Sequence, residues 1–139
     1  MSTHYVYRCF DADDRLLYVG CAANVKKRMS LHALGKARAS RTLAALMARY
    51  TTEGPYSDRA TAEAAEQAAI VAEAPLLNIQ HSRTPGWFND QRVAAYLTDR
   101  GLPLSVAGLH RCEGCDRLRG FHMAPGLCSD CLDDLADSA

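Results

Sequence analysis

Four cysteines near the C-terminus constrain the fold of this 139-residue chain more than any other feature. They form two Cys-x2-Cys pairs separated by twelve residues, at Cys112, Cys115, Cys128 and Cys131. Each pair presents two thiolates to one ion, and the intervening dozen residues suffice for a hairpin that joins the pairs. Two disulfides or a redox motif are the alternatives, but without a secretion signal the thiols should stay reduced, and a redox pair should occur singly. The pattern therefore predicts a four-cysteine module over residues 111–139 that holds one structural Zn²⁺.

The charge distribution indicates an anionic partner, although the whole chain is neutral with 16 basic and 16 acidic side chains. Residues 1–52 hold nine basic and three acidic side chains, whereas residues 53–81 hold one and five. Between Lys26 and Arg49 there are seven basic residues and no acid. Such a run is either a positive surface that faces phosphate or a solvated helix face. The expected DNA contacts within it are Lys26, Lys27, Lys36, Arg38 and Arg41.

Residue periodicity predicts an α+β domain over residues 1–82, a helical connector over 83–110 and then the cysteine module. Aromatic and β-branched residues over 4–10 and 15–20 indicate a hairpin. The later elements are expected at the following positions: a helix after the Asn24 cap, a helix over 40–50 that includes Tyr50, an edge strand or loop over 51–56, and a helix over 59–74 capped by Asp58.

A set of polar side chains occurs in a fixed order along residues 4–80. Its members are Tyr7, Tyr18, Arg28, His32, Glu66 and Asn78. Together with the motifs Tyr5-Val6-Tyr7 and Tyr18-Val19-Gly20, this order resembles the GIY-YIG nuclease family over a little more than half of the chain. Tyr5 stands where the family name implies a glycine, a departure that affects the strand entry and leaves the polar set intact.

The resemblance implies a small three-stranded sheet flanked by helices and a site for metal-dependent phosphodiester hydrolysis. Glu66 would hold a single Mg²⁺ (or Mn²⁺), which is a hard ion that takes carboxylate oxygens and substrate phosphate. Glu63 and Glu73 flank Glu66 on the same helix, so spacing alone does not decide between the three carboxylates. Arg28 would contact the scissile phosphate through charge-assisted hydrogen bonds.

The two tyrosines would orient or deprotonate the attacking water. Tyr7 is expected to be the general base, which requires Arg28, Lys26, Lys27 or a metal-bound water to depress its pKa from about 10. The remaining residues have supporting roles: His32 relays a proton or contacts phosphate, Gly20 permits a tight exit from its strand, and Asn78 is structural.

The predicted function is that of a metal-dependent DNA endonuclease, which the C-terminal zinc module targets to duplex or branched DNA. The module holds two basic and six acidic side chains over 112–139, so its overall charge does not favour binding to DNA. It would contact DNA locally through Arg111, Arg117 and Arg119, bind a protein partner, or only stabilise the chain. The alternative is a non-catalytic DNA- or protein-binding module that keeps the nuclease fold. No membrane partner is expected, and the expected location is the cytoplasm, with nucleoid association in a bacterium or phage.

Overall fold

The structure is a computed structural model, and it consists of two compact units, Met1–Asn89 and Asp90–Ala139. The residues that it describes are 3–35, 38–78, 86–113 and 115–119. No helix within these described ranges is both long enough and apolar enough to span a membrane.

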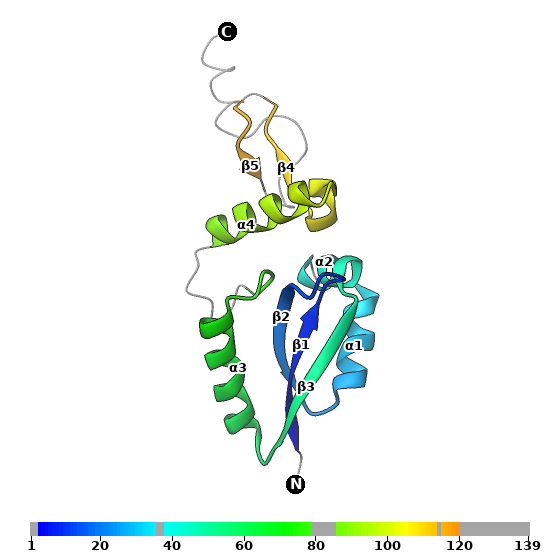
Figure 1. Cartoon of the computed structure of the whole chain (residues 1–139), viewed down its shortest axis with the longest axis vertical. Coiled ribbons are helices and arrows are strands. Elements are labelled where there is room, and N and C mark those ends of the chain that lie inside the picture. Colours follow the sequence, from blue (N-terminus) through cyan, green and yellow to red (C-terminus); the bar gives the residue numbers. More distant parts are fainter. Residues whose placement is uncertain (1–2, 36–37, 79–85, 114, 120–139) are drawn as a thin grey trace. The chain divides into compact units, whose positions relative to one another are not determined.

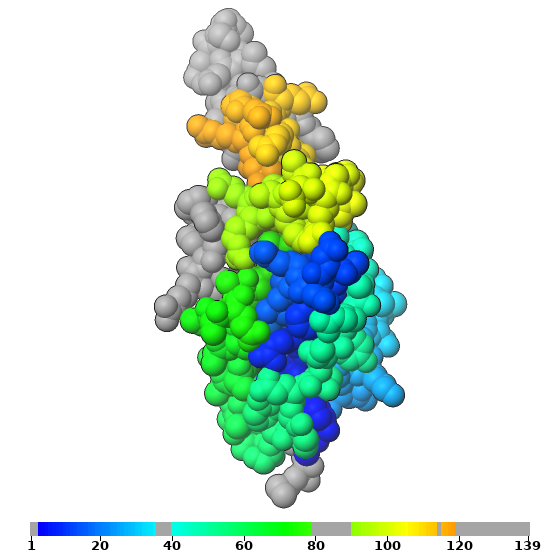
Figure 2. All heavy atoms as spheres, viewed as in Figure 1, coloured from blue at the N-terminus to red at the C-terminus, as the bar shows by residue number. Residues whose placement is uncertain are grey.

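The first unit is built on a three-stranded antiparallel sheet, which confirms the α+β class (Figure 1). Its strands are β1 (His4–Phe10), β2 (Leu16–Ala22) and β3 (Arg49–Tyr56), in the spatial order β2-β1-β3. β1 is therefore central, and β2 and β3 are the edge strands. All but the last residue of β3 are exposed, and Figure 2 shows this strand at the surface of the unit.

Three helices cover the two faces of this sheet, with α1 (Val25–Leu34) and α2 (Arg38–Leu46) on one side and α3 (Arg59–Glu73) on the other (Figure 1). The helix starts follow the capping residues that the sequence predicts. Asn24 Oδ1 accepts a hydrogen bond from the Lys27 amide at 3.0 Å, and Asp58 Oδ1 accepts one from the Thr61 amide at 2.7 Å. Each cap satisfies a backbone donor that has no partner within its helix.

The alternation of side chains along the strands separates the core from the site. Val6 and Val19 face α3 and pack in one buried cluster with Ala69 and Ile70. Tyr7, one residue along β1, points to the other face and contacts His32 of α1. Small residues such as Ala69 bring α3 close to the sheet, so the apolar cluster fixes the position of this helix relative to β2.

The predicted helix over 40–50 is wrong at its C-terminal end, because Tyr50 lies in β3. α2 stops at Leu46, and the amide of Ala48 donates to the carbonyl of Phe10 at 2.8 Å, which draws the chain into the sheet. Arg49 reinforces this turn, since its guanidinium lies 4.2 Å from the centroid of the Phe10 ring. Pairing with β1 across the sheet therefore overrides the helical spacing of the apolar residues.

The second unit contains most of α4 (Gly86–Asp99), a short 3₁₀ helix (Leu104–Ala107) and a two-stranded hairpin of β4 (His110–Arg111) and β5 (Leu118–Arg119). Val93, Leu97 and Leu109 supply buried apolar side chains to this unit.

Candidate active site

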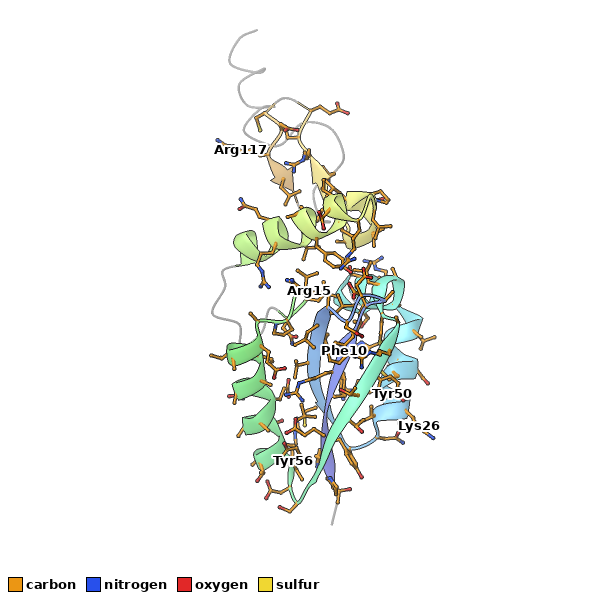
Figure 3. The ribbon with its side chains drawn as sticks, in the orientation of Figure 1. Phe10, Arg15, Lys26, Tyr50, Tyr56 and Arg117 are labelled. Carbon is orange, nitrogen blue, oxygen red and sulfur yellow. The ribbon has the colours of Figure 1, made fainter. Side chains whose placement is uncertain are left out.

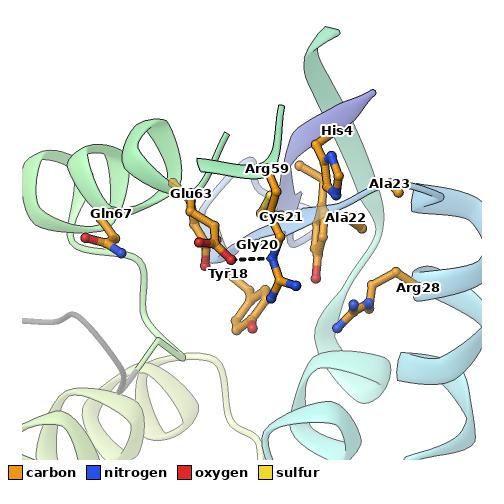
Figure 4. Close-up of a pocket in the computed structure, with 12 residues that line it drawn as sticks. His4, Tyr18, Gly20, Cys21, Ala22, Ala23, Arg28, Arg59, Glu63 and Gln67 are labelled. Atoms are coloured by element: carbon orange, nitrogen blue, oxygen red, sulfur yellow. Dashed lines mark hydrogen bonds and ion pairs between the residues drawn. The ribbon is translucent and has the colours of Figure 1, made fainter. Parts of the chain in front are cut away.

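A cavity of about 620 Å³ lies where β2 passes between α1 and α3. Five of the residues expected at the active site line it: Tyr7, Tyr18, Gly20, Arg28 and Glu66. They come from β1, β2, α1 and α3, so the fold assembles residues that are distant in sequence. Figure 4 shows Tyr18 and Arg28 at this cavity, which is called the first cavity below.

Behind the first cavity, Tyr7 begins a chain of hydrogen bonds. Its hydroxyl lies 3.0 Å from Nε2 of His32, and Nδ1 of His32 lies 3.0 Å from the hydroxyl of Ser40. Burial and the charge of Arg28 lower the pKa of His32 below 6.5, so its imidazole is neutral at neutral pH. A neutral imidazole donates through one nitrogen and accepts through the other, so it links Tyr7 to Ser40 as a path for a proton.

The two tyrosines and His32 form a cluster of three rings. The ring centroids of Tyr18 and His32 lie 5.5 Å apart, and those of Tyr7 and Tyr18 lie 6.1 Å apart. Arg28 lowers the pKa of Tyr7, as the sequence analysis expects, but it does not bring this pKa below its usual value of about 10. Burial and the adjacent Tyr18 raise this pKa, and the opposing effect of Arg28 is smaller. The reason is that Tyr7 is 1% exposed, whereas Arg28 lies in solvent, where its field is screened.

The three carboxylates of α3 have different surroundings. Glu73 is outside the first cavity, and it binds Arg8 with a 2.8 Å ion pair. Glu63 and Glu66 both line the cavity, but Oε1 of Glu63 lies 2.6 Å from Nε of Arg59, and Figure 4 marks this ion pair. The geometry therefore removes Glu73 as a candidate metal ligand and gives Glu63 a competing cation.

The donor set of the first cavity fits a hydrated divalent ion. Within the described part of the chain, no group of three or more His, Cys, Asp or Glu side chains forms a protein cage for a metal. Mg²⁺ does not need such a cage, because it keeps most of its water ligands and takes one or two carboxylates together with substrate phosphate. Glu66, with Glu63 one turn before it, is a donor set of this kind.

Three further polar residues of the first cavity were missed by the sequence analysis: His4, Arg59 and Gln67. The sequence could have indicated Arg59 and Gln67, because they are spaced four residues on either side of Glu63 and so share its face of the helix. Arg59 adds a second guanidinium to the cavity wall. His4 lies at the start of β1, and its Nδ1 is buried without a hydrogen-bond partner.

Gly20 is required for a reason other than the predicted strand exit, because β2 continues to Ala22. A Cβ atom at Gly20 would lie 2.3 Å from both Cζ and the hydroxyl oxygen of Tyr7. Tyr7 and Gly20 are direct partners across the β1–β2 ladder. The absence of a side chain at Gly20 thus makes the space that the Tyr7 ring occupies.

Asn78 completes the outer edge of β2. Its Oδ1 accepts from the amide of Val19 at 2.8 Å, and its Nδ2 donates to the carbonyl of Val19 at 2.9 Å. The amides of Leu76 and Leu77 donate hydrogen bonds to the carbonyls of Leu16 and Leu17, respectively. This segment covers the edge of β2 from Leu16 to Val19, and Gly20, Cys21 and Ala22, which line the cavity, follow directly.

The described residues of the basic run come from three elements, α1, α2 and β3. Lys27 and Arg41 are exposed on α1 and α2, while Lys26 lines a different cavity. Arg49 forms an ion pair of 2.9 Å with Asp14. Lys36 and the side chain of Arg38 lie outside the described residues.

Two of the four cysteines of the predicted zinc module lie within the described residues. Cys112 is buried at the end of β4 and Cys115 is exposed in the following turn. The amide of Cys112 donates to the carbonyl of Arg117 at 2.8 Å, and the amide of Asp116 donates to the carbonyl of Cys112 at 2.9 Å. These bonds close a tight turn around the first cysteine pair, near Arg117 (Figure 3). Cys128 and Cys131 lie outside the described residues, so the zinc site stays a prediction.

Comparisons with known proteins give one family and one curated relative. The family model of the GIY-YIG catalytic domain matches residues 3–78, which hold β1 to α3 and Asn78. UvrABC system protein C of Ectopseudomonas mendocina (strain ymp) is 35% identical over 122 residues. That alignment spans 86% of this chain but only 18% of the relative. No solved structure matches the chain significantly.

Proposed function

Because the chain belongs to the GIY-YIG nuclease family through residues 3–78, we propose that it hydrolyses phosphodiester bonds of DNA at the first cavity. The observation that carries this proposal is the convergence of Tyr7, Tyr18, Arg28 and Glu66 on one cavity from four different elements. A cleft with a guanidinium, a carboxylate and two phenols has the groups that phosphodiester hydrolysis needs.

Arg28 is the phosphate-binding group in this proposal. Its exposed guanidinium stands at the cavity wall, where it can donate two hydrogen bonds to the scissile phosphate and stabilise the charge that develops during attack. Arg59 enters the same cavity from the first turn of α3 and is held by Glu63. Two guanidiniums, one from α1 and one from α3, would together bind the oxygens of a phosphodiester.

Tyr7 and His32 handle the proton of the attacking water. Since the pKa of Tyr7 is raised, the phenol carries its proton at neutral pH and does not act as a free phenolate. Neutral His32 can take the phenolic proton at Nε2 while the Tyr7 oxygen accepts a proton from water. The water becomes hydroxide, Tyr7 is restored, and His32 carries the extra proton. Tyr18 contacts both rings and orients the water at the cavity mouth.

A divalent metal belongs in this proposal because the donor set fits it. Glu66 would hold one Mg²⁺ (or Mn²⁺), with Glu63 as the nearest second carboxylate. When bound, the ion supplies Lewis-acid stabilisation of the leaving 3′ oxygen. Without it, the carboxylate of Glu66 would partly offset the attraction of Arg28 for the phosphate, so the metal would strengthen substrate binding as well as support the reaction.

The second unit is proposed to target the nuclease. A four-cysteine site at residues 111–139 would hold one structural Zn²⁺, and the first cysteine pair already forms a closed turn. The exposed side chains of Arg111 and Arg117 flank that turn and would contact DNA phosphates. Because the chain spans 18% of UvrABC system protein C, whose name describes a component of a UvrABC system, any part in such a system is also a proposal.

The experiment is cleavage of supercoiled plasmid and of paired, nicked and branched duplexes with Mg²⁺, run beside Arg28→Ala. We expect the wild type to cut at least one of these DNAs and Arg28→Ala to be at least about 100-fold slower, the usual effect of removing one transition-state donor. Arg15→Ala, which removes an exposed guanidinium from the residue just before β2, outside the cavity, is the matched control. A wild type that binds these DNAs but cuts none of them would favour the non-catalytic binding module.

A further inference from the structure

A second cavity adjoins the turn between β2 and α1. It has a volume of about 490 Å³, and its walls include Tyr5 of β1, Tyr50 and Thr52 of β3, and Lys26 of α1. Ala23 lines both this cavity and the first one, so the β2–α1 turn borders both cavities. A ligand strand that passes this turn would therefore reach both.

Two tyrosine rings give the second cavity its aromatic character. Tyr50 is 39% exposed, although large aromatic side chains are usually covered by the fold. Tyr5 packs against the backbone of β3, since a Cβ at Gly54 would lie 3.3 Å from Cδ1 of its ring. Figure 3 shows Tyr50 and Lys26 on neighbouring elements. The exposed ring of Tyr50 and the supported ring of Tyr5 provide flat apolar surface of the kind on which nucleobases stack.

The start of α1 adds positive charge to the same cavity. Its first turn holds Lys26 and Lys27 and no acidic residue. Lysines at this end of a helix oppose the helix dipole and cost stability, so their placement favours an anionic ligand. The second cavity thus combines aromatic surface with a cationic rim, which together match a nucleotide better than an apolar peptide or a lipid chain.

We propose that the second cavity binds one unpaired nucleotide of the DNA strand whose scissile phosphate lies in the first cavity, an inference that rests on the proposed function. The base stacks on Tyr50 beside Tyr5, the hydroxyl of Thr52 offers a hydrogen bond to the base edge, and Lys26 neutralises a phosphate. A base within an intact duplex is not available for such stacking. The substrate class is therefore DNA with an unpaired nucleotide, such as a bulge, a gap or a branch.

The test measures binding of the full chain to two duplexes without divalent metal, so that no cleavage occurs. One duplex is fully paired, and the other carries a bulged 2-aminopurine whose fluorescence falls when it stacks on an aromatic ring. We expect the wild type to prefer the bulged duplex and to quench its fluorescence. In Tyr50→Ala, the ratio of the two affinities should fall by about tenfold, the effect of losing one stacked base.

Control variants separate this role from a loss of folding. Leu31→Ala removes an exposed apolar side chain of α1 outside both cavities and should keep the ratio of affinities, as should Tyr50→Phe. Tyr5→Ala should lower the ratio independently of Tyr50. If Tyr50→Ala and Tyr5→Ala both keep the ratio, the cavity takes something other than a nucleotide and the proposal is overturned. If the wild type cuts paired DNA but does not prefer the bulge, only the subsite fails, whereas a wild type that neither binds nor cuts DNA overturns both proposals.

Discussion

Replacing Gly20 with alanine tests how the fold positions Tyr7. The new Cβ would lie 2.3 Å from Cζ and from the hydroxyl oxygen of Tyr7, whereas ordinary contact begins at 3.4 Å, so the ring must retreat by about 1.1 Å. Tyr7 is 1% exposed, and its hydroxyl is held by the hydrogen bond to His32, so a retreat of the ring disturbs that contact. We expect Gly20→Ala to lower the free energy of unfolding by about 1–3 kcal/mol, as overpacking does. A shift of about 1 Å at a reacting group should also slow cleavage about 100-fold.

The matched control is Val19→Ala, the neighbouring buried position whose side chain faces α3. Its cavity should cost about 2 kcal/mol and leave the first cavity unchanged. Urea denaturation gives the two stabilities, and single-turnover cleavage of one duplex gives the two rates. The reasoning is refuted if folded Gly20→Ala cuts as fast as the wild type, or if Val19→Ala loses as much activity as Gly20→Ala.

Four other predictions concern His32, Asn78 and the two cysteine pairs. Because burial lowers the pKa of His32 below 6.5, His32 stays neutral and able to accept a proton from about pH 7 to about pH 9, and kcat/KM should be level over this range. It should fall only below pH 6.5, where His32 becomes protonated. A fall that begins above pH 6.5 would contradict the role of His32 as proton acceptor. His32 has a lower pKa in the folded protein than in the unfolded chain, so the unfolded chain binds the proton more readily. The free energy of unfolding should therefore fall as the pH drops below 6.5, and it should fall less in His32→Gln. Asn78→Ala leaves the buried amide and carbonyl of Val19 without their partner and should cost about 2–5 kcal/mol in urea denaturation; a cost under about 1 kcal/mol would show that water replaces the side chain. Purified protein should contain about one zinc ion per chain, and Cys115→Ser should lose it; a Cys115→Ser protein that keeps its zinc would refute the four-cysteine site.

The local signals of the sequence were sufficient for most of the first unit. Alternating residues predicted β1 and β2, and Asn24 and Asp58 predicted two helix starts, because capping depends on neighbouring residues alone. Tyr50 was assigned to a helix because its apolar spacing continued that of Leu43 and Leu46. Its position in β3 depends on pairing with β1, which is distant in sequence and has no local signal.

The candidate site shows the same division. The order of polar residues predicted which side chains meet, and the first cavity contains five of them. The sequence did not reveal that the Tyr7 ring fills the space above Gly20, nor that burial raises the pKa of Tyr7, since both depend on the packed environment. The ion pair of Glu63 with Arg59 shows that Glu63 faces a cation within the first cavity, which helical spacing alone does not reveal.

The most direct test of a metal-dependent active site at the first cavity is the single-turnover rate of strand cleavage by Glu66→Gln. This variant keeps the size of the side chain and removes the charge that would hold the metal. With Mg²⁺ we predict a loss of at least about 100-fold relative to the wild type, and a much smaller loss for Glu73→Gln, whose carboxylate binds Arg8 outside the cavity. Cleavage by Glu66→Gln at the wild-type rate would contradict the account.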